Sequence, residues 1–336
     1  MTGAHSRPLA NRGAVLVTGA AGFIGSHVAR ALCRAGERIV VSDPVTGPVA
    51  EHNLAGVTIA AEVPPEKLGG FLEAEKNHIG AIVHMGAISA TTETRVPRII
   101  ENNITLSRDL WNFAARACVP FIYASSAATY GDGAQGFDDA FDERAMAQLR
   151  PLNIYGWSKL VFDRMVEKSV REKAPVPPQW AGLRFFNAYG THEAHKGPQS
   201  SVVSQLLPKL ARGEAARLFR SHREGFADGA QLRDFVHVGD CVGVITWLLS
   251  ANASGIFNVG TGKARTFLDL ARACFAALGI KEKIDFIDMP ETLRAQYQYF
   301  TQARMDRLIA QGYPHKFTSL EDGVAQCARA LRGTST

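Results

Sequence analysis

The chain has 336 residues, of which 46% are hydrophobic and 21% charged, and its formal net charge is +5 at pH 7. This length and composition predict a globular protein with a large core, built as one large or two unequal domains. The charge is spread along the chain without a run of five basic residues. This charge distribution favours phosphorylated small molecules as ligands, and we expect no nucleic-acid partner.

The five cysteines are scattered and form no Cys-x-x-Cys pair. This pattern indicates thiols in a reducing compartment, and neither a disulfide framework nor a zinc site. Residues 1–11 lack the apolar core of a signal peptide, and no apolar run approaches ~18 residues. We therefore expect a cytoplasmic protein without a membrane partner, in which residues 1–11 form a disordered arm.

The first motif is a glycine-rich turn between an apolar run at residues 15–17 and a helical pattern at residues 26–35. Its glycines are Gly19, Gly22 and Gly25. Glycines in a strand–turn–helix context allow a tight turn and let the backbone approach a pyrophosphate at the helix N-terminus. The simpler alternative is an ordinary strand-to-helix turn.

The next strand is predicted at residues 38–43 and ends in Asp43, about 18 residues after Gly25, where an acidic side chain can bind a ribose diol. This position favours NAD over NADP. The alternative is that Asp43 only forms the turn before Pro44.

A further buried strand is predicted at residues 79–85, and the small residues that follow it would let the backbone lie against a cofactor. Met85, Gly86 and Ala87 are the candidates there. We expect a helix at residues 94–118, which carries Asn102 and Asn103.

A strand predicted at residues 119–124 leads to Ser126. A hydroxyl at the carboxyl end of a parallel strand points into the crevice of the sheet, so Ser126 can bond a substrate hydroxyl. The alternative is a cap in a serine-rich loop.

Tyr155 precedes Lys159 by four residues on a predicted helix that residues 151–153 open, so the two side chains share a face. A phenol is a poor base at neutral pH, with a pKa near ~10. A nearby ammonium favours the phenolate, so we expect Lys159 to lower the pKa of Tyr155. The pair then acts as a general acid/base. By itself the spacing also occurs on solvated helices.

The alternation of strands and helices through residue 186 predicts an α/β fold, a Rossmann doubly wound parallel sheet with a smaller α/β substrate domain. We assign residues 12–186 to the dinucleotide-binding domain, with returns at about 231–259 and 285–290. Residues 187–230, 260–284 and 291–332 form the substrate domain. His192 and His195 are spaced too irregularly with Glu193 for a metal site, so no metal is expected.

These motifs occur in an order that resembles the extended short-chain dehydrogenase/reductase superfamily. The residues that carry the resemblance are Thr18-Gly19-x-x-Gly22-x-x-Gly25, Ser126, Tyr155-x-x-x-Lys159 and Arg233-Asp234-Phe235-Val236. The resemblance covers nearly the whole chain after residue 12. It implies an enzyme that binds a dinucleotide and acts on a nucleotide sugar.

Within the superfamily the chain is most similar to the ADP-glyceromanno-heptose 6-epimerase family. The matching stretches are residues 89–93, 123–131 and 151–153, together with His195-Lys196-Gly197, Tyr297-Gln298 and Phe300-Thr301-Gln302. The resemblance implies an ADP-heptose substrate, a role in lipopolysaccharide core precursor synthesis and a homo-oligomer. It also implies that Lys196 is a second catalytic group beside Ser126, Tyr155 and Lys159. Without the resemblance, Lys196 is a solvated loop lysine.

The resemblance and the motifs together define two sets of contacts. The expected cofactor contacts are Gly19, Gly22, Phe23, Ile24, Gly25, Asp43, Met85, Gly86, Ala87, Ser89, Asn102, Tyr155, Lys159, Ala188 and Lys196. The expected substrate contacts are Ser89, Asn187, Gln205, Phe219, Arg233 and Tyr297.

Two departures from the family pattern leave alternatives open. The family implies NADP, but residues 43–48 contain no Lys or Arg to hold a 2′-phosphate, which favours NAD. Residues 220–230 are longer and more charged than expected, which leaves the nucleotide and sugar open.

The alternatives are another epimerase, such as a UDP-hexose 4-epimerase, and a non-catalytic dinucleotide-binding protein. Intact Ser126, Tyr155 and Lys159 argue against the non-catalytic protein. A 4,6-dehydratase is less favoured because Ala127-Ala128 offers no carboxylic acid.

Overall fold

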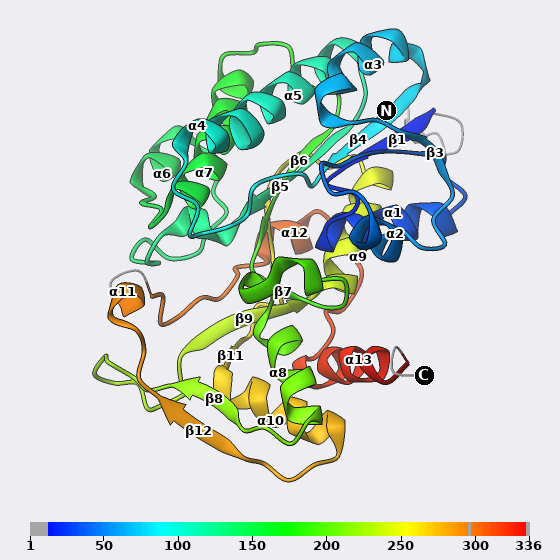
Figure 1. Cartoon of the computed structure of the whole chain (residues 1–336). Helices are drawn as coiled ribbons and strands as arrows, with labels where there is room; N and C mark the ends of the chain where they lie inside the picture. The colour runs from blue at the N-terminus through cyan, green and yellow to red at the C-terminus, as the bar shows by residue number, and fades with distance from the viewer. Residues whose placement is uncertain (1–12, 295–296, 334–336) are drawn as a thin grey trace.

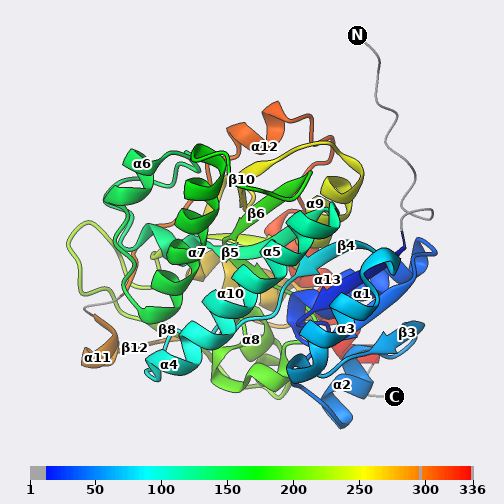
Figure 2. The same ribbon diagram turned by 90° about the horizontal axis from the view of Figure 1, so that it is seen from above.

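The computed structural model describes residues 13–294 and 297–333, and its largest element is a parallel sheet in the order β10-β6-β5-β4-β1-β2-β3. Helices cover both faces of this sheet (Figures 1 and 2), which confirms the expected α/β doubly wound fold. The arm predicted at residues 1–11 lies outside the described residues. The strands are β1 (Ala14–Thr18), β2 (Ile39–Ser42), β3 (Ile59–Glu62), β4 (Ile79–His84), β5 (Phe121–Ser126), β6 (Trp180–Phe185) and β10 (Gly255–Val259).

The central strands are apolar because both faces of the sheet are covered. Every residue of β1, β2, β4, β6 and β10 is buried, which is the usual pattern of a parallel sheet between two helical layers. The outer strand β3 alternates between half-buried and exposed residues. It falls in residues 44–78, whose structure the sequence pattern did not predict.

The helices are α1 (Phe23–Arg34), α2 (Pro48–Asn53), α3 (Leu68–Ala74), α4 (Val96–Ile99), α5 (Leu106–Ala117), α6 (Glu143–Gln148), α7 (Ile154–Arg171), α8 (Val202–Ala211), α9 (Val238–Ser250), α10 (Phe267–Leu278), α11 (Glu291–Arg294), α12 (Asp306–Ala310) and α13 (Leu320–Gly333). The helices around residues 26–35, 94–118 and 155–159 lie close to their predicted positions, whereas the short helices α2, α3, α6 and α11 were not predicted. A π-helical segment, η4 (Ile100–Thr105), joins α4 to α5. The helix expected at residues 94–118 therefore exists, with this wider turn inside it. None of the helices in residues 13–294 and 297–333 is long and apolar enough to cross a membrane.

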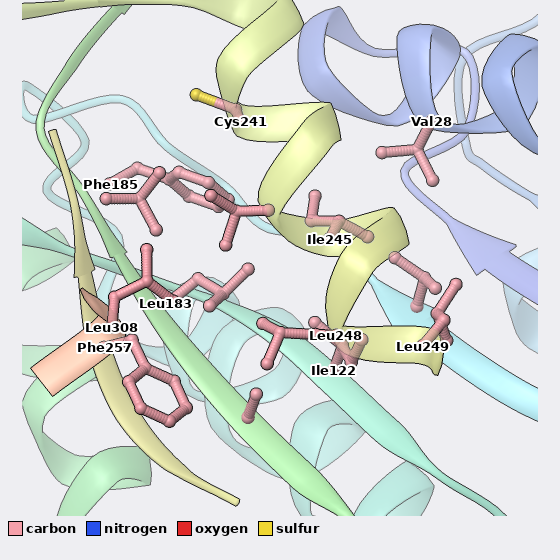
Figure 3. Packing of buried hydrophobic residues seen from close by; sticks show 14 of the residues in the cluster. Val28, Ile122, Leu183, Phe185, Cys241, Ile245, Leu248, Leu249, Phe257 and Leu308 are labelled. Atoms are coloured by element: carbon pink, nitrogen blue, oxygen red, sulfur yellow. The ribbon is translucent and has the colours of Figure 1, made fainter. Parts of the chain in front are cut away.

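One core fills the space between the sheet and the helices α1 and α9. Figure 3 shows α9 between α1 and the strands, with its apolar side chains directed toward both. A second core lies on the opposite face, where Trp111 of α5 packs edge-on against Phe121 of β5 and Trp180 of β6, each with ring centroids 5.8 Å apart. The sheet is thus held from both sides.

The rest of the chain forms a smaller region below the carboxyl end of the main sheet in Figure 1. One small sheet has the order β11-β9-β7, with β7 (Asn187–Tyr189), β9 (Leu232–His237) and β11 (Ala264–Thr266). The other pairs β8 (Ala216–Phe219) with β12 (Ile284–Ile287). The helices α8, α10 and α13 pack together around a third core. Strands β6 and β7 follow each other directly in the chain but belong to different sheets.

The structure corrects one predicted return to the main sheet and part of another. Residues 285–290 do not return, because β12 pairs with β8, and β9 pairs with β7 and β11. Within the predicted return at 231–259, α9 and β10 rejoin the large sheet. Helix α12 also packs there, through Leu308, although it falls in the predicted substrate domain. The reason lies in the side chains. Asp285 and Ile287 of β12 are exposed while Ile284 and Phe286 are half-buried, a pattern that suits a sheet with one face in water.

A buried ion pair joins four elements beneath the carboxyl end of β5. Arg184 Nε of β6 lies 3.0 Å from Asp163 Oδ2 of α7, and both side chains are 0% exposed. Asp163 also accepts hydrogen bonds from Tyr123 Oη at 3.0 Å and Ser125 Oγ at 2.9 Å, both on β5. Arg184 donates in addition to Tyr130 Oη at 3.1 Å. Each charge is therefore compensated by its partner and by hydroxyl groups, as a buried pair requires.

Removing one member of this pair should destabilise the protein strongly. We expect Asp163→Ala to lower the free energy of unfolding by about 3–5 kcal/mol, because Arg184 is left buried without its counter-charge. Urea denaturation would measure the change. The matched control is Asp109→Ala, which removes an exposed carboxylate 3.0 Å from Arg108 and should change stability by less than about 0.5 kcal/mol. Equal effects of the two substitutions would contradict the expectation.

Candidate active site

A cavity of about 710 Å³ lies at the carboxyl end of the main sheet. It opens between the large sheet and the smaller region, next to β1 and β4, where the strand order reverses. Ligands of open α/β sheets bind at such a reversal. Its wall contains all of the expected cofactor residues: Gly19, Gly22, Phe23, Ile24, Gly25, Asp43, Met85, Gly86, Ala87, Ser89, Asn102, Tyr155, Lys159, Ala188 and Lys196.

Glycine is required at two positions of the turn between β1 and α1. Gly19 has φ +65°, and a Cβ there would lie 2.6 Å from the amide nitrogen of Gly86. A Cβ on Gly25 would lie 1.9 Å from the carbonyl oxygen of Gly19. The turn can therefore press closely on the strand end and on α1. It leaves the N-terminus of α1 at the cavity, which suits a pyrophosphate.

Asp43 follows β2 and is fixed by backbone amides. Its Oδ2 accepts from the amide of Ala21 at 2.9 Å, and its Oδ1 accepts from the amide of Val45 at 2.8 Å. Burial raises the pKa of Asp43, while these amides oppose the shift. The carboxylate is thus held rigidly at the cavity wall next to the glycine turn, as a contact to a ribose requires.

A chain of buried hydrogen bonds runs beneath the cavity from β1 to α5. The His84 ring has Nδ1 2.6 Å from Thr18 Oγ1 and Nε2 2.9 Å from Ser107 Oγ. Because Ser107 Oγ donates to the carbonyl of Asn103 at 2.8 Å, His84 Nε2 donates to Ser107 and Nδ1 accepts from Thr18. Burial lowers the pKa of His84 to about 3, and the charge of Lys159 acts in the same direction. His84 is therefore neutral at physiological pH.

Asn103 continues this chain toward α7. Its Oδ1 accepts from the amide of Ile88 at 2.8 Å, and its Nδ2 donates to Ser158 Oγ at 3.0 Å. Ser158 Oγ donates to the carbonyl of Tyr155 at 2.7 Å. Asn102, the residue expected to contact the cofactor, lines the cavity and donates to the carbonyl of Arg98 at 2.9 Å. No role was predicted for His84, Ser107 or Asn103. A polar residue inside the apolar strand at residues 79–85 was the available signal.

Ser126, Tyr155 and Lys159 meet at the carboxyl end of β5. Tyr155 makes a hydrogen bond with the Ser126 side chain, and both line the cavity. Gly156 lets α7 approach, since a Cβ there would lie 2.6 Å from the carbonyl oxygen of Ala128. Asn153 caps α7 by accepting from the amide of Gly156 at 2.8 Å.

The electrostatics of this group differ in one respect from the prediction. Desolvation raises the pKa of Tyr155, and only the hydrogen bond from Ser126 opposes the shift. Lys159 was expected to lower the pKa of Tyr155, but its ammonium donates to the carbonyl of Ala124 at 2.8 Å. Burial lowers the pKa of Lys159 to about 8, against the attraction of Asp163. The prediction that Lys159 lowers the pKa of Tyr155 is therefore wrong.

Lys196 reaches the same cavity from the loop after β7. It belongs to a short 3-10 helix, η6 (Ala194–Gln199), and about a quarter of its side chain is exposed. Its Nζ donates to Glu193 Oε2 at 3.0 Å and lies 4.7 Å from the centre of the Phe23 ring. The cavity wall therefore carries Tyr155 on α7 and Lys196 on a separate loop. No group of three or more metal-binding side chains occurs in the described parts of the chain.

The expected substrate residues divide into two groups. Ser89 and Asn187 line the cavity, whereas Gln205, Phe219, Arg233 and Tyr297 are not part of its wall. The Arg233 guanidinium lies 5.1 Å from the Tyr297 ring and 5.6 Å from the Phe267 ring, and Phe219 packs edge-on against Tyr297 at 6.2 Å.

Phe267, which lines the cavity, connects this cluster to it. Gln205 lies elsewhere and donates to the carbonyls of Pro198 and Ser200 at 3.1 and 2.8 Å. Phe267 was not predicted as a site residue, because an apolar residue at the start of a helix has nothing in the sequence that sets it apart.

Comparison with known proteins gives consistent similarities. Residues 15–260 match the NAD dependent epimerase/dehydratase family. The chain is 44% identical over 321 residues to ADP-L-glycero-D-manno-heptose-6-epimerase of Nitratidesulfovibrio vulgaris strain DP4, which covers 94% of this chain and 96% of that protein. The Fusobacterium nucleatum protein of the same name is 40% identical, over 92% of this chain and 95% of its own.

Among solved structures, the Helicobacter pylori ADP-L-glycero-D-manno-heptose-6-epimerase superposes with a TM-score of 0.79 at 26% identity, covering 97% of this chain and 98% of its own. MoeE5, solved in complex with UDP-glucuronic acid and NAD, has a TM-score of 0.74 at 26% identity, over 96% and 100% of the two chains.

The buried neutral His84 predicts acid sensitivity. Its folded pKa of about 3 lies below the ordinary 6.5, so between these values the unfolded chain binds a proton that the folded chain does not. Stability is therefore complete above pH 6.5 and is lost as the pH falls toward 3. We expect His84 to contribute about 1 kcal/mol to the loss of unfolding free energy between pH 6 and pH 5.

Urea denaturation at several pH values would measure this loss. His84→Gln should reduce the slope with pH, whatever its effect on absolute stability. The exposed His315→Gln is the control and should leave the slope unchanged. Identical slopes for wild type and His84→Gln would refute the assignment.

Proposed function

Because the chain belongs to the NAD-dependent epimerase/dehydratase family, we propose that it interconverts ADP-D-glycero-D-manno-heptose and ADP-L-glycero-D-manno-heptose by inversion at C6. The product would serve as a lipopolysaccharide core precursor. The relatives that are 40–44% identical bear the name of this activity. The observation that carries the proposal is that two acid/base side chains, Tyr155 and Lys196, reach one cavity from different elements.

The dinucleotide site fits the residues present. The glycine turn leaves no room for a Cβ at Gly19 or Gly25, and the N-terminus of α1 suits the pyrophosphate. Asp43 is held at the wall where the adenosine ribose would lie. Lys159 would hold the nicotinamide ribose. A bound nicotinamide dinucleotide supplies reversible acceptance of the C6 hydride, which removes and then restores the stereocentre.

Two acid/bases suit this reaction because the C6 hydrogen is not acidic and a carbonyl has to form at C6. In one half-reaction Tyr155 takes the proton from the C6 hydroxyl, while Ser126 orients the oxygen. After the C6 group has turned over, Lys196 gives a proton to the oxygen from the other side. In the reverse direction the two side chains exchange roles. Ser126, Tyr155 and Lys196 all line the cavity.

NAD is the cofactor that the residues favour. The fixed carboxylate of Asp43 would repel a 2′-phosphate and accept hydrogen bonds from a 2′-hydroxyl, and residues 44–48 supply no Lys or Arg. The resemblance to the heptose epimerases would instead suggest NADP. The charge of Asp43 supports NAD more directly, because NAD and NADP differ at the 2′ position of the adenosine ribose, where this carboxylate would lie.

The activity can be tested by incubating the protein with ADP-D-glycero-D-manno-heptose and resolving the two C6 epimers. We expect Tyr155→Phe and Lys196→Met each to lower kcat/KM by roughly 10²–10⁴-fold, since each removes a proton-transfer group, while the cofactor stays bound. Lys263→Met, on the surface, is the control and should keep wild-type activity. Turnover of UDP-glucose without conversion of the heptose would contradict the proposal, as would full activity of the Lys196 variant.

The cofactor prediction has its own measurement. The dinucleotide released on denaturation of the purified protein should have the mass of NAD or NADH, because it is regenerated at each turnover and has no need to leave. We expect the Asp43→Asn variant to retain less NAD than the wild-type protein. A neutral amide oxygen accepts a hydrogen bond from a ribose hydroxyl less strongly than a carboxylate does. Recovery of NADP as the main species would contradict this prediction.

A further inference from the structure

Glu193 is a buried acidic residue beside Lys196, and the proposed reaction does not yet use it. It follows β7, its side chain is 0% exposed, and it lies at the N-terminus of α8. Burial of a carboxylate costs free energy unless the charge is well compensated. A loop lysine on the surface needs no such partner, so this arrangement calls for a physical reason.

Four donors surround the Glu193 carboxylate. Oε1 accepts from the amide of Gly190 at 3.2 Å and from Ser204 Oγ at 3.1 Å. Oε2 accepts from the amide of Ser201 at 2.8 Å and from Lys196 Nζ at 3.0 Å. An ionised carboxylate accepts about four hydrogen bonds and donates none. The site therefore fits Glu in its charged form. In a glutamine at this position, the NH2 group would face groups that are themselves hydrogen-bond donors.

The donors also come from separate parts of the smaller region. Ser201 caps α8 by accepting from the amide of Ser204, so the carboxylate lies at the positive end of a ten-residue helix. Gly190 ends the segment that leaves the sheet through β7. Glu193 thus ties the loop that carries Lys196 to a rigid helix and to the end of a strand.

The ammonium of Lys196 is held between two groups of different kinds. Glu193 is on one side at 3.0 Å, and the Phe23 ring is 4.7 Å away. Phe23 is the first residue of α1 and lines the cavity. A carboxylate and an aromatic face both stabilise a cation. These two contacts therefore fix Nζ at the wall next to the cofactor turn.

We propose that Glu193 is a positioning residue for Lys196, which fixes Nζ at the cavity wall so that the amine is ready to donate. The proposal rests on the proposed epimerase function. When Lys196 gives its proton to the oxygen at C6, the N–H bond breaks, its electron pair stays on nitrogen, and an O–H bond forms. The exposed quarter of the Lys196 side chain lets water return the proton afterwards, while Tyr155 loses the proton that it took.

The test is to measure kcat and KM separately for conversion of ADP-D-glycero-D-manno-heptose. We expect Glu193→Gln to lower kcat about tenfold with little change in KM, because Nζ loses the carboxylate that holds it at the wall. Glu193→Asp keeps the carboxylate and should recover part of the lost kcat. A residue with only a structural role would show no such recovery and would lose activity in step with stability.

Glu167→Gln is the matched control. It also removes a buried carboxylate that lies 3.0 Å from a cation, Arg171, but on α7 away from the cavity wall. It should leave kcat unchanged. Thermal unfolding would report whether each variant folds. If Glu193→Gln does not fold, Glu193→Asp carries the test, because its longer contact to Nζ should lower kcat by a smaller amount.

A double variant separates action through Lys196 from action elsewhere. In the Lys196→Met background, Glu193→Gln should cost much less than the tenfold that it costs alone. An equal cost in both backgrounds, or an unchanged kcat in a folded Glu193→Gln variant, would overturn the inference while leaving the epimerase proposal intact. A wild-type protein that does not convert the heptose would instead overturn the proposed function, and the inference with it.

Discussion

The buried pair of Arg184 and Asp163 links the stability of the sheet to the chemistry of the cavity. Its two charges are fully removed from water, and hydroxyl groups of β5 and η5 (Ala127–Tyr130) add hydrogen bonds to both of them. Among the described residues, Arg184 Nη2 has no hydrogen-bond partner. Asp163 lies one helical turn after Lys159. Its charge raises the pKa of Lys159 against the effect of burial. The carboxylate that anchors α7 to β6 therefore also helps to keep the candidate catalytic lysine protonated.

A second set of polar contacts positions the cofactor turn relative to α7. The chain of hydrogen bonds from Thr18 through His84, Ser107 and Asn103 to Ser158 crosses beneath the cavity. It joins the end of β1 to the backbone of Tyr155. Such a network is costly when incomplete, because an unpaired buried polar group loses its hydration without compensation. The distance between the dinucleotide turn and the acid/base is thus set by polar groups of defined geometry, in addition to apolar packing.

The sequence predicted those parts of the fold whose pattern is local. Strand, glycine turn and helix follow one another around Gly19–Gly25, and helix α7 has its cap and its Tyr155–Lys159 pair within a few residues. What could not be predicted depends on distant partners. Strand β12 was assigned to the large sheet because a short apolar segment does not reveal which strand it pairs with. The shift at Tyr155 depends on desolvation and on the carbonyl that Lys159 finds, neither of which a four-residue spacing contains. The positions of Gln205 and Arg233, outside the cavity wall, also depend on distant contacts that a local sequence pattern does not contain.

The two parts of the chain contribute different things to the cavity. Ser126, Tyr155 and Lys159 stand on long buried elements of the large sheet, whereas the ring cluster around Arg233 and Tyr297 belongs to short strands and loops of the smaller region. Substitutions in this ring cluster can therefore change recognition without altering Ser126, Tyr155 or Lys159. Lys196 is the exception among the candidate proton-transfer groups, because it stands on a loop of the smaller region. This separation makes the architecture readily evolvable, because most changes in recognition do not have to be compensated in the core.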